Sequence, residues 1–299
     1  RLKFLMEEGE KTLTPYEIVK ITRHPQRFTL QDILENVYDS YMELGGEGEL
    51  NIDPAMVCAK AMIVRKVGND LHFHQVMVIG HEKGHGEEFR QGGSAKPWGN
   101  EKALRYMKMA ETEGIPIHFF IFTPGAYPIE DYPGSAQQIA RNLYYMAKLK
   151  VPTIAFISEG GSGGAEAIGL TDMRLMAEKG YYSVISPEGA AAIEAKLKDE
   201  RPPRELVEKC AKALKLTAKD NLEFGIIDKI MPEPPLGARK KDYEFFKKLR
   251  FELIKATDEV ILQTRSLKFL RKYVLSKQNA EEFKFFVNWD LDEDETEIL

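Results

Sequence analysis

The sequence has little cysteine and no long uncharged apolar run. Its 299 residues include two cysteines, Cys58 and Cys210, which excludes a four-cysteine zinc ribbon and indicates a reducing compartment. No window approaches ~18 uncharged apolar residues, and no signal-peptide pattern opens the chain. We therefore expect a soluble cytoplasmic protein that does not enter a membrane.

The sequence has no excess of basic residues, with 42 Lys and Arg against 47 Asp and Glu. The net charge is −5, and the last ten residues hold six acidic side chains and no base, so the remainder is nearly neutral. Nucleic-acid binding gains no support, because no strongly basic face is available to pair with phosphates. We interpret the acidic tail as a solvated end, with docking on a basic partner as the alternative.

The apolar content is high enough for a large core, at 43% of residues with a mean hydropathy of −0.36. The residue patterns predict helices near 14–21, 29–44, 100–113, 135–149, 163–170, 188–198, 204–214 and 217–224, and strands near 56–67, 73–82, 115–122, 152–158, 172–178 and 181–186. We place one domain at 1–239 and a C-terminal helical extension with the acidic tail at 240–299. The extension contains an amphipathic helix from about 240 to 265, which either folds back on the core or packs on another subunit.

The most informative segment joins a buried strand pattern to a helix pattern through four glycines. It reads Ser158-Glu159-Gly160-Gly161-Ser162-Gly163-Gly164-Ala165. The N–H groups of Gly163 and Gly164 lie where the helix dipole is positive, and no Cβ blocks a close approach. Two such donors can hold an oxygen that gains negative charge, as in an oxyanion hole. The alternative is that the glycines only let a strand and a helix pack closely.

A second loop of the same kind precedes this segment. A strand pattern at 117–122 ends in Thr123-Pro124-Gly125-Ala126-Tyr127-Pro128 and is followed by a helix pattern at 135–149. Two strand–loop–helix units therefore follow one another in the chain. This second loop either shapes a cleft or is a plain turn.

These segments resemble the α-subunit family of the bacterial acetyl-CoA carboxylase carboxyltransferase. Order and spacing agree over roughly residues 20–240. The matching segments include Arg23-His24-Pro25-Gln26-Arg27, Val76-Met77-Val78-Ile79-Gly80-His81, Thr123 to Pro128, Glu159 to Ala165, Tyr182-Ser183-Val184-Ile185-Ser186-Pro187-Glu188-Gly189 and Gly225-Ile226-Ile227-Asp228. The resemblance implies an α/β, crotonase-like (ClpP/crotonase) ββα superhelix.

The resemblance also implies a reaction and its partners. Carboxybiotin on a separate biotin carboxyl carrier protein would deliver its carboxyl group to acetyl-CoA or another acyl-CoA, giving malonyl-CoA or a homologue for fatty acid biosynthesis. A β subunit with a zinc ribbon would hold the CoA thioester, in a hetero-oligomer of α2β2 type. This chain would be active only with that β-type partner and would bind no metal.

Residue roles follow from the same resemblance. The N–H groups of Gly163 and Gly164 would hold the ureido oxygen of biotin. The residues expected to line the substrate and biotin site are Gly125, Ala126, Tyr127, Gly160, Gly161, Ser162, His81 and Lys83.

The chain departs from the family pattern around this site. Between Gly84 and Lys102 the family carries a Lys/Arg-rich segment, whereas this chain has Glu87, Glu88 and Phe89 there, with Trp98 further on. A less basic and more apolar rim favours an acyl group larger than acetyl. The alternative is that the segment is a surface loop far from the acyl chain.

Two motifs suggest other chemistry. His81-Glu82-Lys83-Gly84-His85 matches the H-E-x-x-H pattern of zinc proteases, but the preceding residues form a strand pattern and the glycines oppose a helix. Gly160 to Gly164 also satisfies G-x-S-x-G, yet no histidine follows Ser162, as the order of a hydrolase triad requires. A biotin-dependent decarboxylase, a stand-alone crotonase-type hydratase or hydrolase, and an inactive scaffold subunit remain as alternatives.

Overall fold

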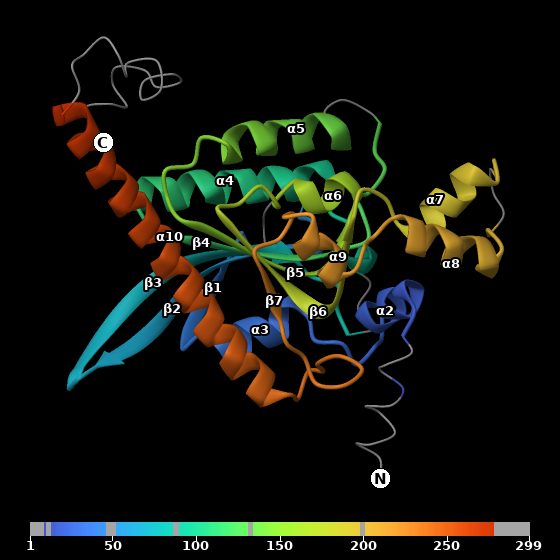
Figure 1. The fold of residues 1–299 in the computed structure, drawn as a ribbon, viewed down its shortest axis with the longest axis horizontal. Coiled ribbons are helices and arrows are strands. Elements are labelled where there is room, and N and C mark those ends of the chain that lie inside the picture. The colour runs from blue at the N-terminus through green and yellow to red at the C-terminus, as the bar shows by residue number, and fades with distance from the viewer. Residues whose placement is uncertain are drawn as a thin grey trace.

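A single seven-stranded sheet organises the chain (Figure 1). The structure is a computed structural model that describes residue 9 and residues 13–45, 52–85, 90–130, 134–197 and 201–277, with side chains described as far as residue 264. The strands are β1 (Ser40–Leu44), β2 (Met56–Val67), β3 (Asp70–His81), β4 (Ile117–Thr123), β5 (Thr153–Gly161), β6 (Met173–Ser183) and β7 (Lys229–Met231). They lie side by side in chain order. The first three are antiparallel, whereas β3 to β7 are parallel.

Helices cover both faces of this sheet. They are α2 (Pro15–Thr22), α3 (Leu30–Val37), α4 (Pro97–Glu113), α5 (Ser135–Met146), α6 (Ser162–Glu166), α7 (Pro187–Glu194), α8 (Arg204–Ala213), α9 (Ala218–Glu223) and α10 (Tyr243–Lys277), with a 3-10 turn at Gln91–Gly93. Figure 1 shows α4 and α5 over one face and α3 and α10 over the other, with α7 and α8 set to one side. Within the described residues, no helix combines the length and the apolarity that crossing a bilayer requires.

The central strand β4 shows why the sheet is covered twice. All of its residues are buried. Side chains alternate between the two faces of a strand, so Phe119 and Ile121 join the cluster that contains α4, whereas Phe120 and Phe122 join the cluster that contains α3 and α10. A parallel strand buried on both faces is expected to read as a continuous apolar run, as this one does.

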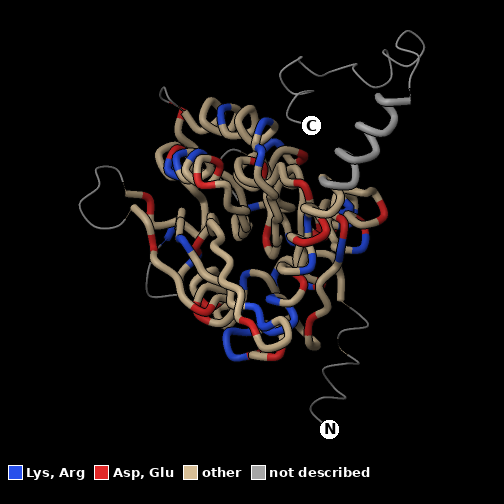
Figure 2. The backbone as a smooth tube through the Cα atoms, turned by 90° about the vertical axis from the view of Figure 1, so that its left-hand side faces the viewer, with Lys and Arg blue, Asp and Glu red and all other residues tan. Residues whose placement is uncertain are grey.

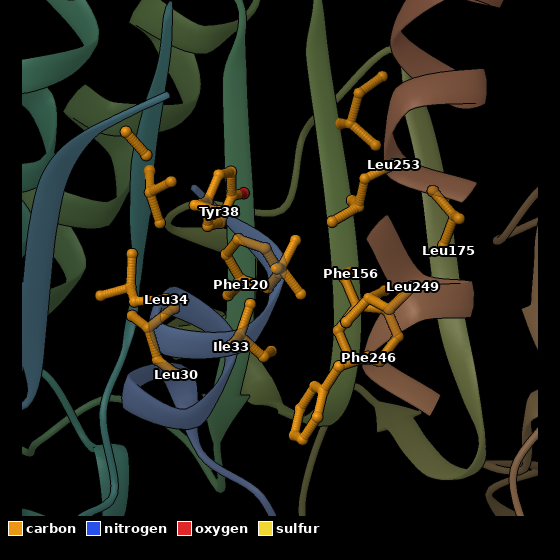
Figure 3. Close-up of a cluster of buried hydrophobic side chains, with 14 of the residues drawn as sticks. Leu30, Ile33, Leu34, Tyr38, Phe120, Phe156, Leu175, Phe246, Leu249 and Leu253 are labelled. Carbon is orange, nitrogen blue, oxygen red and sulfur yellow. The ribbon is translucent and has the colours of Figure 1, made fainter. Parts of the chain in front are cut away.

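The long C-terminal helix is part of this core. Phe246, Leu249 and Leu253 recur on one face of α10 and pack with residues of α3, β4 and β5 (Figure 3). The amphipathic helix predicted from about 240 to 265 therefore folds back on the sheet. The domain boundary at residue 239 stays a prediction, and the acidic tail at 290–297 lies outside the described residues.

Several elements differ from the sequence-based predictions: β7 was not predicted, and the helix expected at 163–170 ends at Glu166. The helix expected at 29–44 ends at Val37, and Ser40–Leu44 pairs with β2 as an edge strand instead, because backbone pairing outweighs the local helix pattern. The strands expected at 172–178 and 181–186 form one strand, β6, whose pairing with β5 shifts register between Ile157 and Glu159. This bulge absorbs the interruption that the sequence shows at Gly180.

Candidate functional site

The loops that follow the parallel strands gather at one edge of the sheet. The carboxyl ends of β3, β4, β5 and β6 meet there, because these strands run in the same direction. Open α/β sheets bind ligands outside the carboxyl ends of their strands. Every residue that we predicted for the biotin site lies at this edge, on β3, β4, β5, α6 or the loops that follow them.

The four-glycine segment forms the junction between β5 and α6. The strand ends at Gly161, and the helix begins at Ser162 with no side-chain hydrogen bond capping it. The first N–H groups of a helix have no partner within the helix, so those of Gly163 and Gly164 are available as donors. Ser162 adopts a positive φ of 54°, which sets the sharp turn between the two elements.

Close backbone contacts explain why this junction requires glycine. A Cβ on Gly161 would lie 1.9 Å from the carbonyl oxygen of Pro124, and a Cβ on Gly164 would lie 2.3 Å from the amide nitrogen of Ala126. Both distances are too short for any side chain. The two loops that the sequence singled out therefore pack directly on each other, and each fixes the position of the other.

A buried carboxylate anchors the end of β5. Glu159 is 1% exposed and forms ion pairs with Arg23, at 2.8 Å, and with Lys83. The hydroxyl of Tyr181 donates a hydrogen bond to the same carboxylate at 3.2 Å. Burial opposes ionisation of Glu159, but Lys83 and Arg23 outweigh it and lower the pKa of the carboxyl. The network joins α2, the β3 end, β5 and β6 immediately before the glycine turn.

Lys83 and His81 take different places at the β3 end. Lys83 points to the Glu159 network and also donates to the carbonyl oxygen of Thr22 at 3.2 Å. His81 is fully buried, neither ring nitrogen has a hydrogen-bond partner among the residues that the structure describes, and burial lowers its pKa to about 3. The imidazole is therefore neutral at pH 7. The direct role at the biotin site that we predicted for these two residues stays a prediction.

Tyr127 lies on the outer side of the β4 loop. Its ring is 37% exposed, and the ammonium group of Lys96 lies 5.4 Å from the ring centroid. Its backbone N–H donates to the carbonyl oxygen of Ala95 at 3.1 Å. Tyr127 is thus held at the rim of the carboxyl edge, whereas Gly125 and Ala126 face the glycine turn.

Two hollows open at this edge. One, of about 340 Å³, is bordered by Arg23, Lys83 and Arg90. The other, of about 380 Å³, lies beside Gly163 between α6, β6 and the α9 region. Both volumes fall in the range of small-molecule sites. Lys and Arg positions are interspersed with Asp and Glu positions along the described chain (Figure 2).

The hollow beside Gly163 contains a carboxyl group. The hydroxyl of Tyr182 donates a hydrogen bond to Oε1 of Glu166. Burial raises the pKa of this carboxyl, and the nearby guanidinium of Arg174 opposes the shift. A partly buried carboxyl in a hollow is typical of functional sites.

The structure explains why, in the part of the chain that it describes, the H-E-x-x-H and G-x-S-x-G motifs do not form a zinc site or a hydrolase triad. His81 ends a strand and His85 contacts Asp32 at 2.9 Å, so the two histidines do not share a helix face. Among the described residues, no cluster of three His, Cys, Asp or Glu side chains could hold a metal ion. The positive φ of Ser162 fits a nucleophile elbow, but no histidine within the described residues hydrogen-bonds to its hydroxyl.

Sequence reasoning missed the Glu159 network and the Glu166 pocket. Arg23 and Glu159 are 136 positions apart, and Tyr181 and Glu159 belong to different strands. No local pattern links them, because only the order of the strands and the packing of α2 beside β5 and β6 bring these residues together. For Glu166 the sequence held a weak indication of a place at the site, because Glu166 lies three residues after Gly163 and so shares its helix face.

Comparison with known proteins finds several relatives that carry the same name. A family model described as acetyl co-enzyme A carboxylase carboxyltransferase-like matches residues 1–277. The acetyl-coenzyme A carboxylase carboxyl transferase subunit α of Chlorobaculum parvum is 46% identical over 238 residues, covering 77% of this chain and 68% of that protein. The Thermus thermophilus protein of the same name is 39% identical, covering 87% of this chain and 81% of that protein.

Solved structures show the same fold. The transcarboxylase 12S structure has a TM-score of 0.60 at 17% identity, and the geranyl-CoA carboxylase β subunit of P. aeruginosa has a TM-score of 0.55 at 16% identity. They cover 79% and 78% of this chain, which spans 42% of each of those chains. These likenesses confirm the predicted crotonase-like α/β fold. On the family match and these identities, the chain belongs to the α-subunit family of the acetyl-CoA carboxylase carboxyltransferases, which are transferases.

Proposed function

We propose that this chain forms the biotin side of a carboxyltransferase that acts on acyl-CoA thioesters. The observation that carries the proposal is the turn at Gly163 and Gly164, where two uncapped N–H groups lie at a helix start beside a second, tightly packed loop. Such donors hold an oxygen that bears negative charge. Carboxybiotin, bound on its carrier protein, would supply the carboxyl group and the ureido oxygen.

We assign to the described residues of this chain the binding and orientation of the biotin ring. Gly163 and Gly164 donate to the ureido oxygen, and the Thr123 to Pro128 loop keeps them in place, since the hydroxyl of Thr123 donates to the carbonyl oxygen of Gly125 at 2.7 Å. The hollow beside Gly163 is large enough for a small bicyclic ring and combines apolar walls with polar groups. Fit to a biotin ring is therefore consistent with the residues present.

We infer that a β-type subunit holds the acyl-CoA thioester, with the biotin carboxyl carrier protein as the third component. The relatives are named as α subunits, which supports a partner of this kind. The zinc ribbon of that partner, the α2β2 stoichiometry and the cytoplasmic location stay predictions. Acetyl-CoA is the substrate in the relatives' names, whereas the preference of this chain for a larger acyl group stays a prediction that rests on residues 84–102.

Carboxyl transfer by the complex of this chain with its β partner tests the proposal. Gly164→Ala should lower kcat by at least ~100-fold, because the new Cβ pushes the loop at Ala126 away and displaces the donors. Ser162→Ala should keep kcat within about threefold of the wild-type value. Loss of activity in the serine variant, with the glycine variant still active, would instead identify Ser162 as a nucleophile and overturn the proposal.

A further inference from the structure

The hollow beside Gly163 has two kinds of wall. Polar groups come from α6 and β6, where Glu166 and Tyr182 lie, and apolar groups come from Val184, Phe224 and Ile226. These apolar side chains are 83%, 61% and 37% exposed, so the described residues leave Val184 and Phe224 largely uncovered and Ile226 partly so. Figure 1 shows that α6 and α9, which flank the hollow, lie on the same side of the sheet.

Glu166 is built into the same surface as the glycine turn. It lies three residues after Gly163, so the two residues share a face of α6. Side chains of a helix lean toward its N-terminus, which carries the carboxyl group of Glu166 back toward the N–H groups of the turn. Both residues line the hollow.

One oxygen of Glu166 is held and the other is not. The hydroxyl of Tyr182 donates to Oε1 and fixes the carboxyl group, and Tyr182 itself is 7% exposed. Within the described residues, Oε2 of Glu166 forms no hydrogen bond. A fixed carboxyl oxygen that faces a hollow is an acceptor for an N–H group of a ligand.

The donors, the acceptor and the apolar walls match one chemical class. A cyclic urea fused to a hydrocarbon ring presents a carbonyl oxygen that accepts, an adjacent N–H that donates, and apolar carbon atoms on the far side. The hollow offers backbone N–H groups at Gly163, a carboxyl acceptor at Glu166, and apolar contact at Phe224. In biotin, the ureido nitrogen that is not carboxylated, N3′, is the only N–H of that ring in the carboxylated state.

We propose that Glu166 is a specificity-determining residue of the biotin site, whose carboxyl group accepts a hydrogen bond from the N3′–H of the ureido ring in the hollow between α6 and α9. This assignment rests on the proposed function. It places the carboxyl group of Glu166 on the side of the ring away from the carboxylated nitrogen, so the two acidic groups do not face each other. Tyr182 positions Glu166, and Phe224 contacts the ring.

Direct binding of free biotin to the complex of this chain with its β partner tests the assignment. Ligand-observed NMR titration suits weak binding and needs no turnover. Glu166→Ala should raise the Kd for biotin about 10-fold or more, because a hydrogen bond to a carboxylate is lost. Glu223→Ala is the matched control, since it removes an exposed carboxylate from the neighbouring helix α9, outside the hollow. Its Kd should equal that of the wild type.

A modified ligand makes the test specific for the N3′–H. Biotin that is methylated at N3′ lacks the donor but keeps the nitrogen that accepts the carboxyl group. The wild-type complex should bind it about 10-fold more weakly than biotin, whereas Glu166→Ala should bind the two ligands equally. Equal binding of both ligands by the wild-type complex, or an unchanged Kd for biotin in Glu166→Ala, would overturn the assignment.

The activity of the same complexes separates this assignment from the proposed function. Carboxyl transfer from malonyl-CoA to free biotin breaks the carbon–carbon bond of the malonyl group, forms the N1′–carbon bond, and moves the N1′ proton to the α-carbon. No transfer by the wild-type complex would overturn the proposed function and the assignment with it. Transfer with an unchanged KM for biotin but a raised KM for malonyl-CoA in Glu166→Ala would overturn the assignment alone.

Discussion

At the scale of single residues, charge burial rather than apolar packing distinguishes the candidate site. Glu159 is almost completely buried, and its two cationic partners are 32% and 16% exposed. An exposed ion pair contributes little to stability, whereas removing one member of a buried pair leaves an uncompensated charge. The glycine turn therefore begins at a point that the rest of the molecule holds firmly.

Replacing Glu159 by glutamine tests this view. We expect Glu159→Gln to lower the free energy of unfolding at pH 7 by about 2–4 kcal/mol, measured by urea denaturation, because Lys83 and Arg23 lose their counter-charge. Glu188→Gln is the control, since its pair with Arg23 is about one-third exposed on both sides and should contribute less than about 1 kcal/mol. Equal losses in the two variants would contradict a special role for Glu159.

The difference in unfolding free energy between wild type and Glu159→Gln should depend on pH in a defined way. The pKa of Glu159 is lowered in the folded chain, so its stabilisation is complete above the ordinary glutamate pKa of about 4.3 and is lost as the pH falls through the folded value. The difference in unfolding free energy between wild type and Glu159→Gln should therefore stay constant from pH 7 to about pH 5 and shrink below it. A difference that grows as the pH falls would show that the ion pairs are not its source.

At the scale of elements, α10 is attached to the sheet by polar contacts as well as by its apolar face. His118 on β4 lies 2.9 Å from the hydroxyl of Tyr38 and 2.9 Å from the hydroxyl of Thr257 on α10. Arg65 on β2 forms a two-pronged contact with Asp258 at 2.9 and 2.8 Å. The helix is thus fixed in register on β4 and β2, at the opposite side of the sheet from α4.

The histidine in this attachment should respond to acid. Burial lowers the pKa of His118 to about 3, below the unfolded value of about 6.5, so its contribution is complete above pH 6.5 and is lost as the pH falls toward 3. His118→Gln should flatten the fall in unfolding free energy between pH 6 and 4 by about 1.4 kcal/mol per pH unit. His24→Gln, at an exposed position, should leave the slope unchanged. An unchanged slope in His118→Gln would mean that the imidazole is protonated in the folded chain.

At the scale of the whole molecule, we propose that the candidate site is one half of a larger site that a β-type partner completes. Gly163 and Gly164 form the glycine turn that we propose as an oxyanion site, and the exposed apolar side chains of Val184 and Phe224 border the hollow beside it. Large apolar side chains gathered at a site are typical of surfaces that another molecule covers. A partner that covers this edge would exclude water from the donors of the turn.

The isolated chain should therefore show negligible carboxyl transfer. We expect activity to appear only when a β-type partner is added, and to saturate with that partner, as followed by transfer from malonyl-CoA to free biotin. A circular dichroism spectrum of the chain alone should match the folded structure, which separates absence of the partner from failure to fold. Robust turnover by the purified chain alone would contradict the two-subunit view.

The sequence by itself determined the strand–loop–helix units and the two loops of the site. Continuous apolar runs predict buried strands such as β4, and the glycines of the β5–α6 junction are required by contacts that no side chain could tolerate, so both leave a clear mark in the sequence. The tertiary structure alone decided the rest. Ser40–Leu44 became a strand because β2 offers it a partner. Glu159 gained Lys83 because the ends of β3 and β5 meet at one edge, and it gained Arg23 because α2 packs beside β5 and β6. Glu166 faces a hollow because α9 lies beside α6. These outcomes depend on residues that are far apart in the chain, and the free energy of such contacts has no local signature.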